Sequence, residues 1–176
     1  SLVRTAVDTF GRLDVAVNNA GATIAGGGRK LTHQHSEDDW AHTLAVNLTA
    51  VFNGMRFQIE QMLAQGGGAI VNMSSVGGVV ASRAGGAAYT AAKHGVLGLT
   101  KQAAAEYAAQ HIRVNAVCPG PILTAMWEPL LAANPAAADR VAARIPLRRL
   151  GTVAEVAQAV LWLASDQASY VTGHAL

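Results

Sequence analysis

Short apolar runs alternate with long helical stretches along this chain, and this alternation limits the folds available to it. Three runs have the length and composition of buried strands, at 13–17, 69–73 and 112–117. Two long stretches with helical periodicity lie between them, at 37–64 and 87–110. Strands joined by helical crossovers pair in parallel, with helices packed on both faces of the sheet. The sequence therefore predicts an α/β fold with a doubly wound parallel sheet.

Capping signals and glycines mark the ends of the helical stretches. Ser36 and the three acidic residues after it have the pattern of a capping box ahead of the first long helix. Gly66 begins the run of three glycines that ends this helix. Thr152, with Glu155 three residues later, gives the same signal for a last helix. Residues 125–143 predict an irregular helical segment between the third strand and that helix.

Composition indicates a folded domain in a reducing compartment. The chain has 176 residues, of which 51% are hydrophobic and 14% charged, which suits one buried α/β interior. Its apolar runs fall short of the roughly 20 residues that a membrane span needs. The single cysteine, Cys118, cannot form an internal disulfide, and its position favours packing over a nucleophilic role. We expect a cytoplasmic protein without a membrane partner.

Charge and histidine spacing argue against two other kinds of site. The formal net charge is only +2, and its one basic cluster, Arg144, Arg148 and Arg149, is explained by a solvated loop rather than by nucleic acid. His33 and His35 lie two residues apart without cysteine or carboxylate partners at ligand spacing, so no metal site is predicted.

Tyr89 and Lys93 form the pattern with the most chemical content. They lie four residues apart on the predicted helix at 87–110, so that the phenol and the ammonium share one face. A free phenol has a pKa of about 10, and a neighbouring ammonium favours the phenolate. A tyrosine in this setting can protonate a carbonyl or deprotonate an alcohol. For this spacing alone, a packed tyrosine beside a solvated lysine is the more common alternative.

Further polar and small residues lie where doubly wound sheets bind ligands, at the carboxyl ends of strands. Ser74 and Ser75 follow the strand at 69–73, although turn residues alone would explain them. Asn47 lies among inward-facing positions of a helix, where either a functional role or the local backbone accounts for its buried amide. Small residues that a flat ligand could approach follow the first and third strands, at 18–21 and 119–124.

Together these residues resemble the motifs of the short-chain dehydrogenase/reductase family. The matching elements are NNAG at 18–21, Asn47, VNMSS at 71–75, YTAAK at 89–93, RVNAVCPG at 113–120 with Thr124, and SYVTGHAL at 169–176. They occur in the family's order and at its approximate spacings, and they cover essentially the whole chain. The sequence is similar to sugar dehydrogenases and to 3-oxoacyl-carrier-protein reductases about equally. The resemblance implies a Rossmann-like fold.

The resemblance also implies an enzyme that interconverts a secondary alcohol and a ketone by hydride transfer with NAD or NADP. Its implied catalytic residues are Asn47, Ser75, Tyr89 and Lys93. Tyr89 would be the general acid and base, and Ser75 would hydrogen-bond the substrate oxygen. Lys93 would bind the nicotinamide ribose and lower the pKa of Tyr89. Asn47 would hold a water that links Lys93 to solvent.

Cofactor contacts beyond Tyr89 and Lys93 follow from the same resemblance. Asn18 would approach the adenosine-side ribose, Ile122 would bond the nicotinamide carboxamide through its backbone, and Thr124 would add a side-chain contact. The remaining implied positions are Ala20, Gly21, Pro119 and Gly120.

Two parts of the family pattern are not found: the first strands with their glycine-rich phosphate turn, and the final strand with its tail. We therefore expect residues 1–176 to form the C-terminal two-thirds of a single NAD(P)-binding Rossmann domain, with an incomplete sheet. Because that turn supplies much of dinucleotide binding, we expect this chain alone to bind cofactor poorly and to turn over little. The alternative is a catalytically inactive fragment that only packs with partner subunits.

The resemblance implies only a class of substrate and a choice of oligomeric states. Specificity in the family lies in variable loops, which correspond to 22–35, 76–88 and 125–148, so that only the class of small alcohols and ketones is implied. The resemblance also implies a homodimer or homotetramer formed through the helices at 37–64 and 87–110.

Overall fold

A three-stranded parallel sheet lies between two layers of helices in the computed structural model, which describes residues 2–22, 30–81, 85–125 and 128–176. The strands are β1 (Val15–Asn18), β2 (Gly68–Met73) and β3 (Ile112–Val117), in the order β1-β2-β3. Val15 is paired with Ala69, and Gly68 with Ile112. The predicted α/β fold with a parallel sheet is confirmed.

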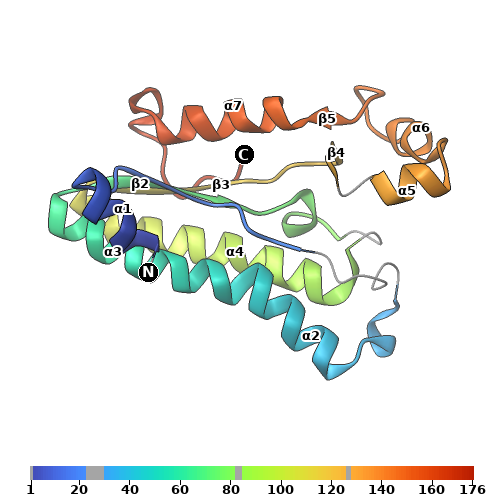
Figure 1. Cartoon of the computed structure of the whole chain (residues 1–176), viewed down its shortest axis with the longest axis horizontal. Helices are drawn as coiled ribbons and strands as arrows, with labels where there is room; N and C mark the ends of the chain where they lie inside the picture. The colour runs from blue at the N-terminus through green and yellow to red at the C-terminus, as the bar shows by residue number, and fades with distance from the viewer. Residues whose placement is uncertain (1, 23–29, 82–84, 126–127) are drawn as a thin grey trace.

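The lower layer in Figure 1 consists of α2 (Glu37–Leu44), α3 (Ala50–Gln65) and α4 (Gly86–Tyr107). Ser36 caps α2 by accepting a hydrogen bond from the Asp39 N–H, as its sequence pattern predicts. Gly66 ends α3 in the left-handed conformation, at φ 92°. The layer packs on the sheet through a core that includes Met55, Met62, Ile70, Val96 and Val114.

The predicted single helix at 37–64 is wrong in one respect. A five-residue π-helical turn (Ala45–Thr49) separates α2 from α3. The buried Asn47 side chain donates to the carbonyl of Thr43, which an α-helix would give to a backbone N–H four residues later. The side-chain amide thus competes with the backbone for this carbonyl within the wide turn.

The upper layer is α7 (Val153–Ala164), which packs on the opposite face of the sheet. Its start is the predicted capping box: Thr152 accepts from the Glu155 N–H, and the Glu155 carboxylate accepts from the Thr152 N–H. Its end is held by Arg113 of β3, whose guanidinium donates to the carbonyls of Leu163 at 2.7 Å, Ala164 at 3.3 Å and Ser165 at 3.0 Å. A cation at a helix C-terminus also complements the helix dipole.

Short elements complete the described chain. The helices are α1 (Leu2–Phe10), α5 (Glu128–Ala133) and α6 (Ala137–Ala142), and the two-residue strands are β4 (Ile122–Leu123) and β5 (Gly151–Thr152), which pair in parallel. Single 3-10 turns occur at Thr32–Gln34, Val76–Gly78, Ala108–Gln110 and Asp166–Ala168. The irregular helical segment predicted at 125–143 corresponds to α5 and α6, with 126–127 outside the described residues. The predicted loops at 22–35 and 76–88 likewise include residues that are not described.

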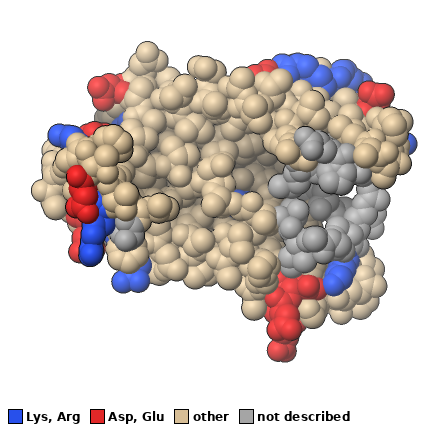
Figure 2. Space-filling model, viewed as in Figure 1, with Lys and Arg blue, Asp and Glu red and all other residues tan. Residues whose placement is uncertain are grey.

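The face viewed in Figure 1 carries β1 at the edge of the sheet, and Figure 2 shows that most of the middle of this face is uncharged. Val15 and Val17 of β1 are 41% and 43% exposed. Apolar residues on an open strand edge favour pairing with further strands. None of the helices in the described part of the chain combines the length and the apolar character needed to cross a lipid bilayer.

We expect the start of α7 to lose stability in acid. The Arg149 guanidinium holds the pKa of Glu155 at about 2, below its usual 4.5, so that the ionised form stabilises the fold above pH 4.5. This contribution is lost as the pH falls from 4.5 through 2. Thermal unfolding of the unmodified chain and of Glu155→Gln between pH 2 and 7 should therefore differ most near neutrality and converge toward pH 2. A difference that stays constant with pH would contradict this assignment.

Candidate functional site

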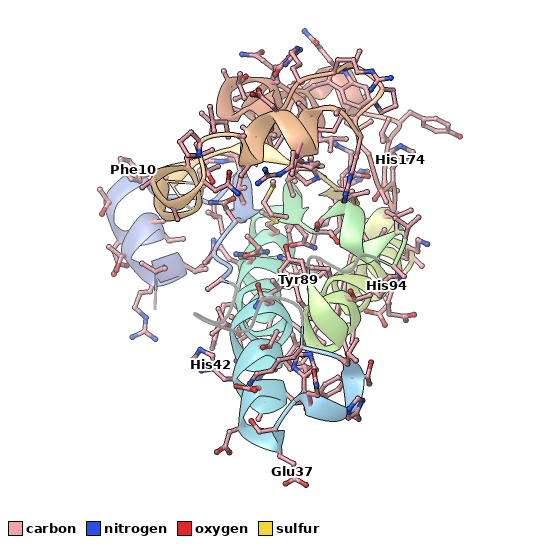
Figure 3. All side chains as sticks on the ribbon, turned by 90° about the vertical axis from the view of Figure 1, so that its right-hand side faces the viewer. Phe10, Glu37, His42, Tyr89, His94 and His174 are labelled. Atoms are coloured by element: carbon pink, nitrogen blue, oxygen red, sulfur yellow. The ribbon has the colours of Figure 1, made fainter. Side chains whose placement is uncertain are left out.

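A cavity of about 750 Å³ lies at the carboxyl ends of the three strands, between α4 and α7. Figure 3 places Tyr89 in the middle of the molecule, between the two helical layers. The structure brings most of the predicted site residues together around this cavity. Those that line it are Gly21, Asn47, Ser75, Tyr89, Lys93, Pro119, Gly120, Ile122 and Thr124.

Ser75 and Tyr89 converge on one glycine. Ser75 is extended at the end of β2, and its hydroxyl accepts a hydrogen bond of 3.1 Å from the Gly77 N–H. A side chain at Gly77 would begin 3.6 Å from Ser75 Oγ and 3.7 Å from Tyr89 Cε1. The hydroxyl and the phenol ring therefore lie on the same wall of the cavity, with the small glycine between them.

Lys93, one helical turn after Tyr89 on α4, is buried, with 4% of its surface exposed. Its Nζ is 5.6 Å from the centroid of the Tyr89 ring and donates to the Met73 carbonyl at 2.9 Å. Burial lowers the pKa of the ammonium from its usual 10.5, because removal from water disfavours the charged form. The ammonium and the Tyr89 ring thus form a cation–π contact.

Asn47 is held by the backbone and also lies at the cavity, and its functional role stays a prediction. Its side-chain amide donates to the carbonyls of Ala22, at 2.8 Å, and Thr43, at 3.0 Å, while its Oδ1 accepts from the Ala22 N–H at 3.2 Å. The local backbone thus accounts for the buried amide, yet the residue also lines the cavity. A side chain at Gly21 would begin 3.0 Å from Asn47 Oδ1 and 3.5 Å from Lys93 Nζ, so the loop after β1 reaches the lysine.

Asn18 points away from the cavity. Its amide donates to Gln58 at 3.0 Å and to Asn72 at 2.8 Å, on the face of the sheet that α3 covers. Neighbouring residues of a strand face opposite sides, and accordingly Val17 and Asn19 line the cavity instead. Ala20 is not among the lining residues either. A contact of Asn18 or Ala20 with a cofactor stays a prediction, and strand alternation is the signal that would have identified Asn19.

The sequence interpretation missed one whole wall of the cavity. Five apolar residues of α7 form it: Val153, Val156, Ala157, Val160 and Leu161. Their spacing of three, four, seven and eight residues is the apolar stripe of an amphipathic helix, and it was visible in the sequence. Small and apolar walls around a few convergent polar groups suit a flat aromatic ligand.

Cys118 lies just after β3, behind Lys93. Burial raises the pKa of its thiol above the usual 9.0, while the neighbouring polar groups of Ser74 and Ser75 oppose the shift. The side chain is therefore a neutral thiol near pH 7, which agrees with the predicted packing role. Within the described residues, no group of three or more histidine, cysteine and acidic side chains is placed to hold a metal ion.

Comparisons with known proteins give concordant matches. The family described as enoyl-(acyl carrier protein) reductase matches residues 1–176. The 3-oxoacyl-[acyl-carrier-protein] reductase FabG of Thermotoga maritima is 45% identical over 175 residues, which cover 99% of this chain and 68% of that protein. Cyclohexanol dehydrogenase of an Acinetobacter species is 46% identical over 171 residues, which cover 97% of this chain and 64% of that protein.

Solved structures of known proteins show the same similarity to this chain. ElxO with NADP bound has a TM-score of 0.92 at 33% identity, and the match covers 99% of this chain and 69% of that one. A protein of Burkholderia xenovorans described as a short-chain dehydrogenase/reductase has a TM-score of 0.91 at 38% identity, with 99% and 66% covered.

The position of Tyr89 depends on a bare glycine, and we expect Gly85→Ala to displace the ring. An added Cβ would lie 2.6 Å from Tyr89 Cδ1, closer than real contacts allow, although the backbone at Gly85 (φ −94°) suits alanine. The variant should lose about 1–3 kcal/mol of stability through overpacking and shift the Tyr89 ring resonances in NMR spectra. Gly98→Ala on the same helix has open space around the new methyl and should instead gain about 0.5–1 kcal/mol. Unshifted Tyr89 resonances in Gly85→Ala would contradict the contact.

Proposed function

The chain belongs to the short-chain dehydrogenase/reductase family, and from that membership we propose that it interconverts a secondary alcohol and a ketone as an NAD(P)-dependent oxidoreductase. The observation that carries the proposal is the convergence of Asn47, Ser75, Tyr89 and Lys93 on one cavity. A bound nicotinamide would supply or accept the hydride. The chain's own residues orient the substrate oxygen and move its proton.

Tyr89 is the proton donor and acceptor in this proposal. In reduction its hydroxyl protonates the ketone oxygen, and in oxidation its phenolate removes the alcohol proton. Ser75 hydrogen-bonds the same oxygen and stabilises the charge that develops on it. The Lys93 ammonium stabilises the phenolate that remains after proton donation. Asn47, close to Lys93 through the loop at Gly21, is the residue through which a water would connect the lysine to solvent.

The cofactor is NAD or NADP, held along the loops that follow β1 and β3. Gly120, Ile122 and Thr124 line the cavity on the β3 side and would receive the nicotinamide end. Ile122 is fixed there because β4 pairs with β5, which ties this loop to the start of α7. The apolar wall of α7 would cover one face of the ring.

The substrate remains a class rather than a compound. The two relatives compared above differ by one percentage point in identity, yet one is named for a 3-oxoacyl group carried on a protein and the other for cyclohexanol. Overall similarity therefore does not select between a chain-bound and a free cyclic substrate. A small secondary alcohol or ketone is the class that Ser75 and Tyr89 support.

Residues 1–176 form, in this proposal, the C-terminal two-thirds of a single NAD(P)-binding domain. The chain spans 68% of the FabG relative and 69% of the ElxO structure, which supports that extent. The competing function, an inactive fragment that only packs with partner subunits, is favoured by the open apolar edge at Val15 and Val17. Turnover by the purified chain separates the two.

A homodimer or homotetramer is proposed through α3 and α4. A second groove of about 430 Å³ runs between these helices, and its residues include Met55, Ile59, Leu63 and Leu99. Phe52, which also lines it, is 46% exposed. Arg56, Glu60 and Glu106 also line the groove, and its apolar residues support burial against a second copy of the same face.

Tyr89→Phe should abolish most of the activity, because it removes the only proton that the phenol can transfer. We expect turnover to fall at least 100-fold, measured by NAD(P)H absorbance with a panel of secondary alcohols and ketones. Tyr107→Phe, at the far end of α4, is the matched control and should retain full activity. Full activity in Tyr89→Phe would refute the proton role, and an unmodified chain without any turnover would favour the inactive alternative.

Phe52→Asp should weaken self-association, because it replaces an exposed aromatic side chain of the groove with a charged one. Light scattering coupled to size exclusion should show a shift toward the monomer mass. Leu147→Asp, at an exposed apolar position outside the groove, should leave the mass unchanged. An oligomer that persists in Phe52→Asp would place the interface elsewhere.

A further inference from the structure

Two hydrogen bonds run in opposite directions between the end of β2 and residue 93. The Lys93 ammonium donates to the Met73 carbonyl at 2.9 Å, and the hydroxyl of Ser74 donates to the Lys93 carbonyl at 2.9 Å. Both side chains are buried, with Ser74 6% and Lys93 4% exposed. Residue 75 follows directly, and Tyr89 lies one helical turn before Lys93 on α4. The pair of bonds therefore joins the two elements that carry the serine and the tyrosine of the site.

A glycine makes this close contact possible. A Cβ at Gly78 would meet the Ser74 hydroxyl and would lie 2.7 Å from the Lys93 carbonyl oxygen and 2.9 Å from its carbon. Gly78 belongs to the 3-10 turn that follows Ser75. The turn thus packs against the backbone of α4 with no side chain between them, at the residue that Ser74 binds.

We infer that Ser74 is a positioning residue, whose hydroxyl fixes α4 against the end of β2 and so sets the separation of Ser75 and Tyr89. The inference rests on the proposed oxidoreductase function. The two bonds are not equivalent, because the Lys93 ammonium must leave or share the Met73 carbonyl when it binds a cofactor ribose. The Ser74 bond uses only the main chain of Lys93, and it remains in place when the ammonium moves.

This role differs from simple packing. In an α-helix the Lys93 carbonyl also accepts the N–H four residues later, so loss of the Ser74 hydroxyl leaves no unsatisfied carbonyl. Alanine at this position leaves a space no larger than one hydroxyl, and the fold should persist. The expected consequence is a less exact placement of Tyr89, to which proton transfer is sensitive.

The test compares Ser74→Ala with Thr100→Val. Thr100 is the matched control because its hydroxyl is also buried and also joins α4 to β2: it accepts from the Asn72 amide at 3.0 Å and donates to the Val96 carbonyl. Loss of one hydrogen bond, worth about 1–1.5 kcal/mol, corresponds to about a tenfold change in rate. Ser74→Ala should lower kcat about tenfold and leave the KM for NAD(P)H nearly unchanged. Thr100→Val should keep kcat within about twofold.

Equal losses of kcat in the two variants, or an unchanged kcat in Ser74→Ala, would overturn the inference. If the unmodified chain shows no turnover, the inactive-fragment alternative holds for this chain, and amide hydrogen exchange decides the positioning role by itself. Exchange across residues 89–97 should then be about tenfold faster in Ser74→Ala than in Thr100→Val. Equal exchange in the two variants would reject the role of Ser74.

Discussion

The burial of the Lys93 ammonium sets the arrangement around the cavity. A buried cation costs several kcal/mol unless other groups compensate it, and none of the ion pairs in the described part of the chain includes Lys93. Its compensation comes from the Met73 carbonyl and from the Tyr89 ring. The end of β2, the first turns of α4 and the loop at Gly21 must therefore meet around one atom. That requirement brings a phenol, a hydroxyl and a cation together.

A second polar network holds the layers that support this arrangement. Asn18 of β1 binds Gln58 of α3 and Asn72 of β2. Buried amides that satisfy one another fix register more strictly than apolar packing does, because a shift of one residue would leave each unpaired. Asn18 is paired in register with Asn72 at the point where the strands end. The loops that line the cavity thus begin from fixed positions.

Local signals in the sequence predicted the elements well, and contacts between distant residues account for what it missed. The caps at Ser36 and Thr152 and the stop at Gly66 depend on a few neighbouring residues, so they were predictable. The contact of Asn47 with the carbonyl of Ala22 was not, because Ala22 is twenty-five residues away in the sequence. Single motifs for the site were each ambiguous. Their order along the chain predicted a common cavity, but not which of Asn18 and Asn19 would face it.

The wall that α7 contributes to the cavity is only partly covered by the rest of the described chain. Val153 and Leu161 line it, yet each is 60% exposed, whereas Leu163 near the end of the helix is fully buried. The helix is held at its ends by the cap at Thr152 and by Arg113, and it packs on the sheet through Val156, Ala159 and Val160. Contact of apolar side chains with water is unfavourable. A flat ligand that covers the apolar side chains of α7 would therefore bind more tightly, by the free energy of burying them. Because such a ligand binds only the folded chain, its affinity and the stability of the fold are linked.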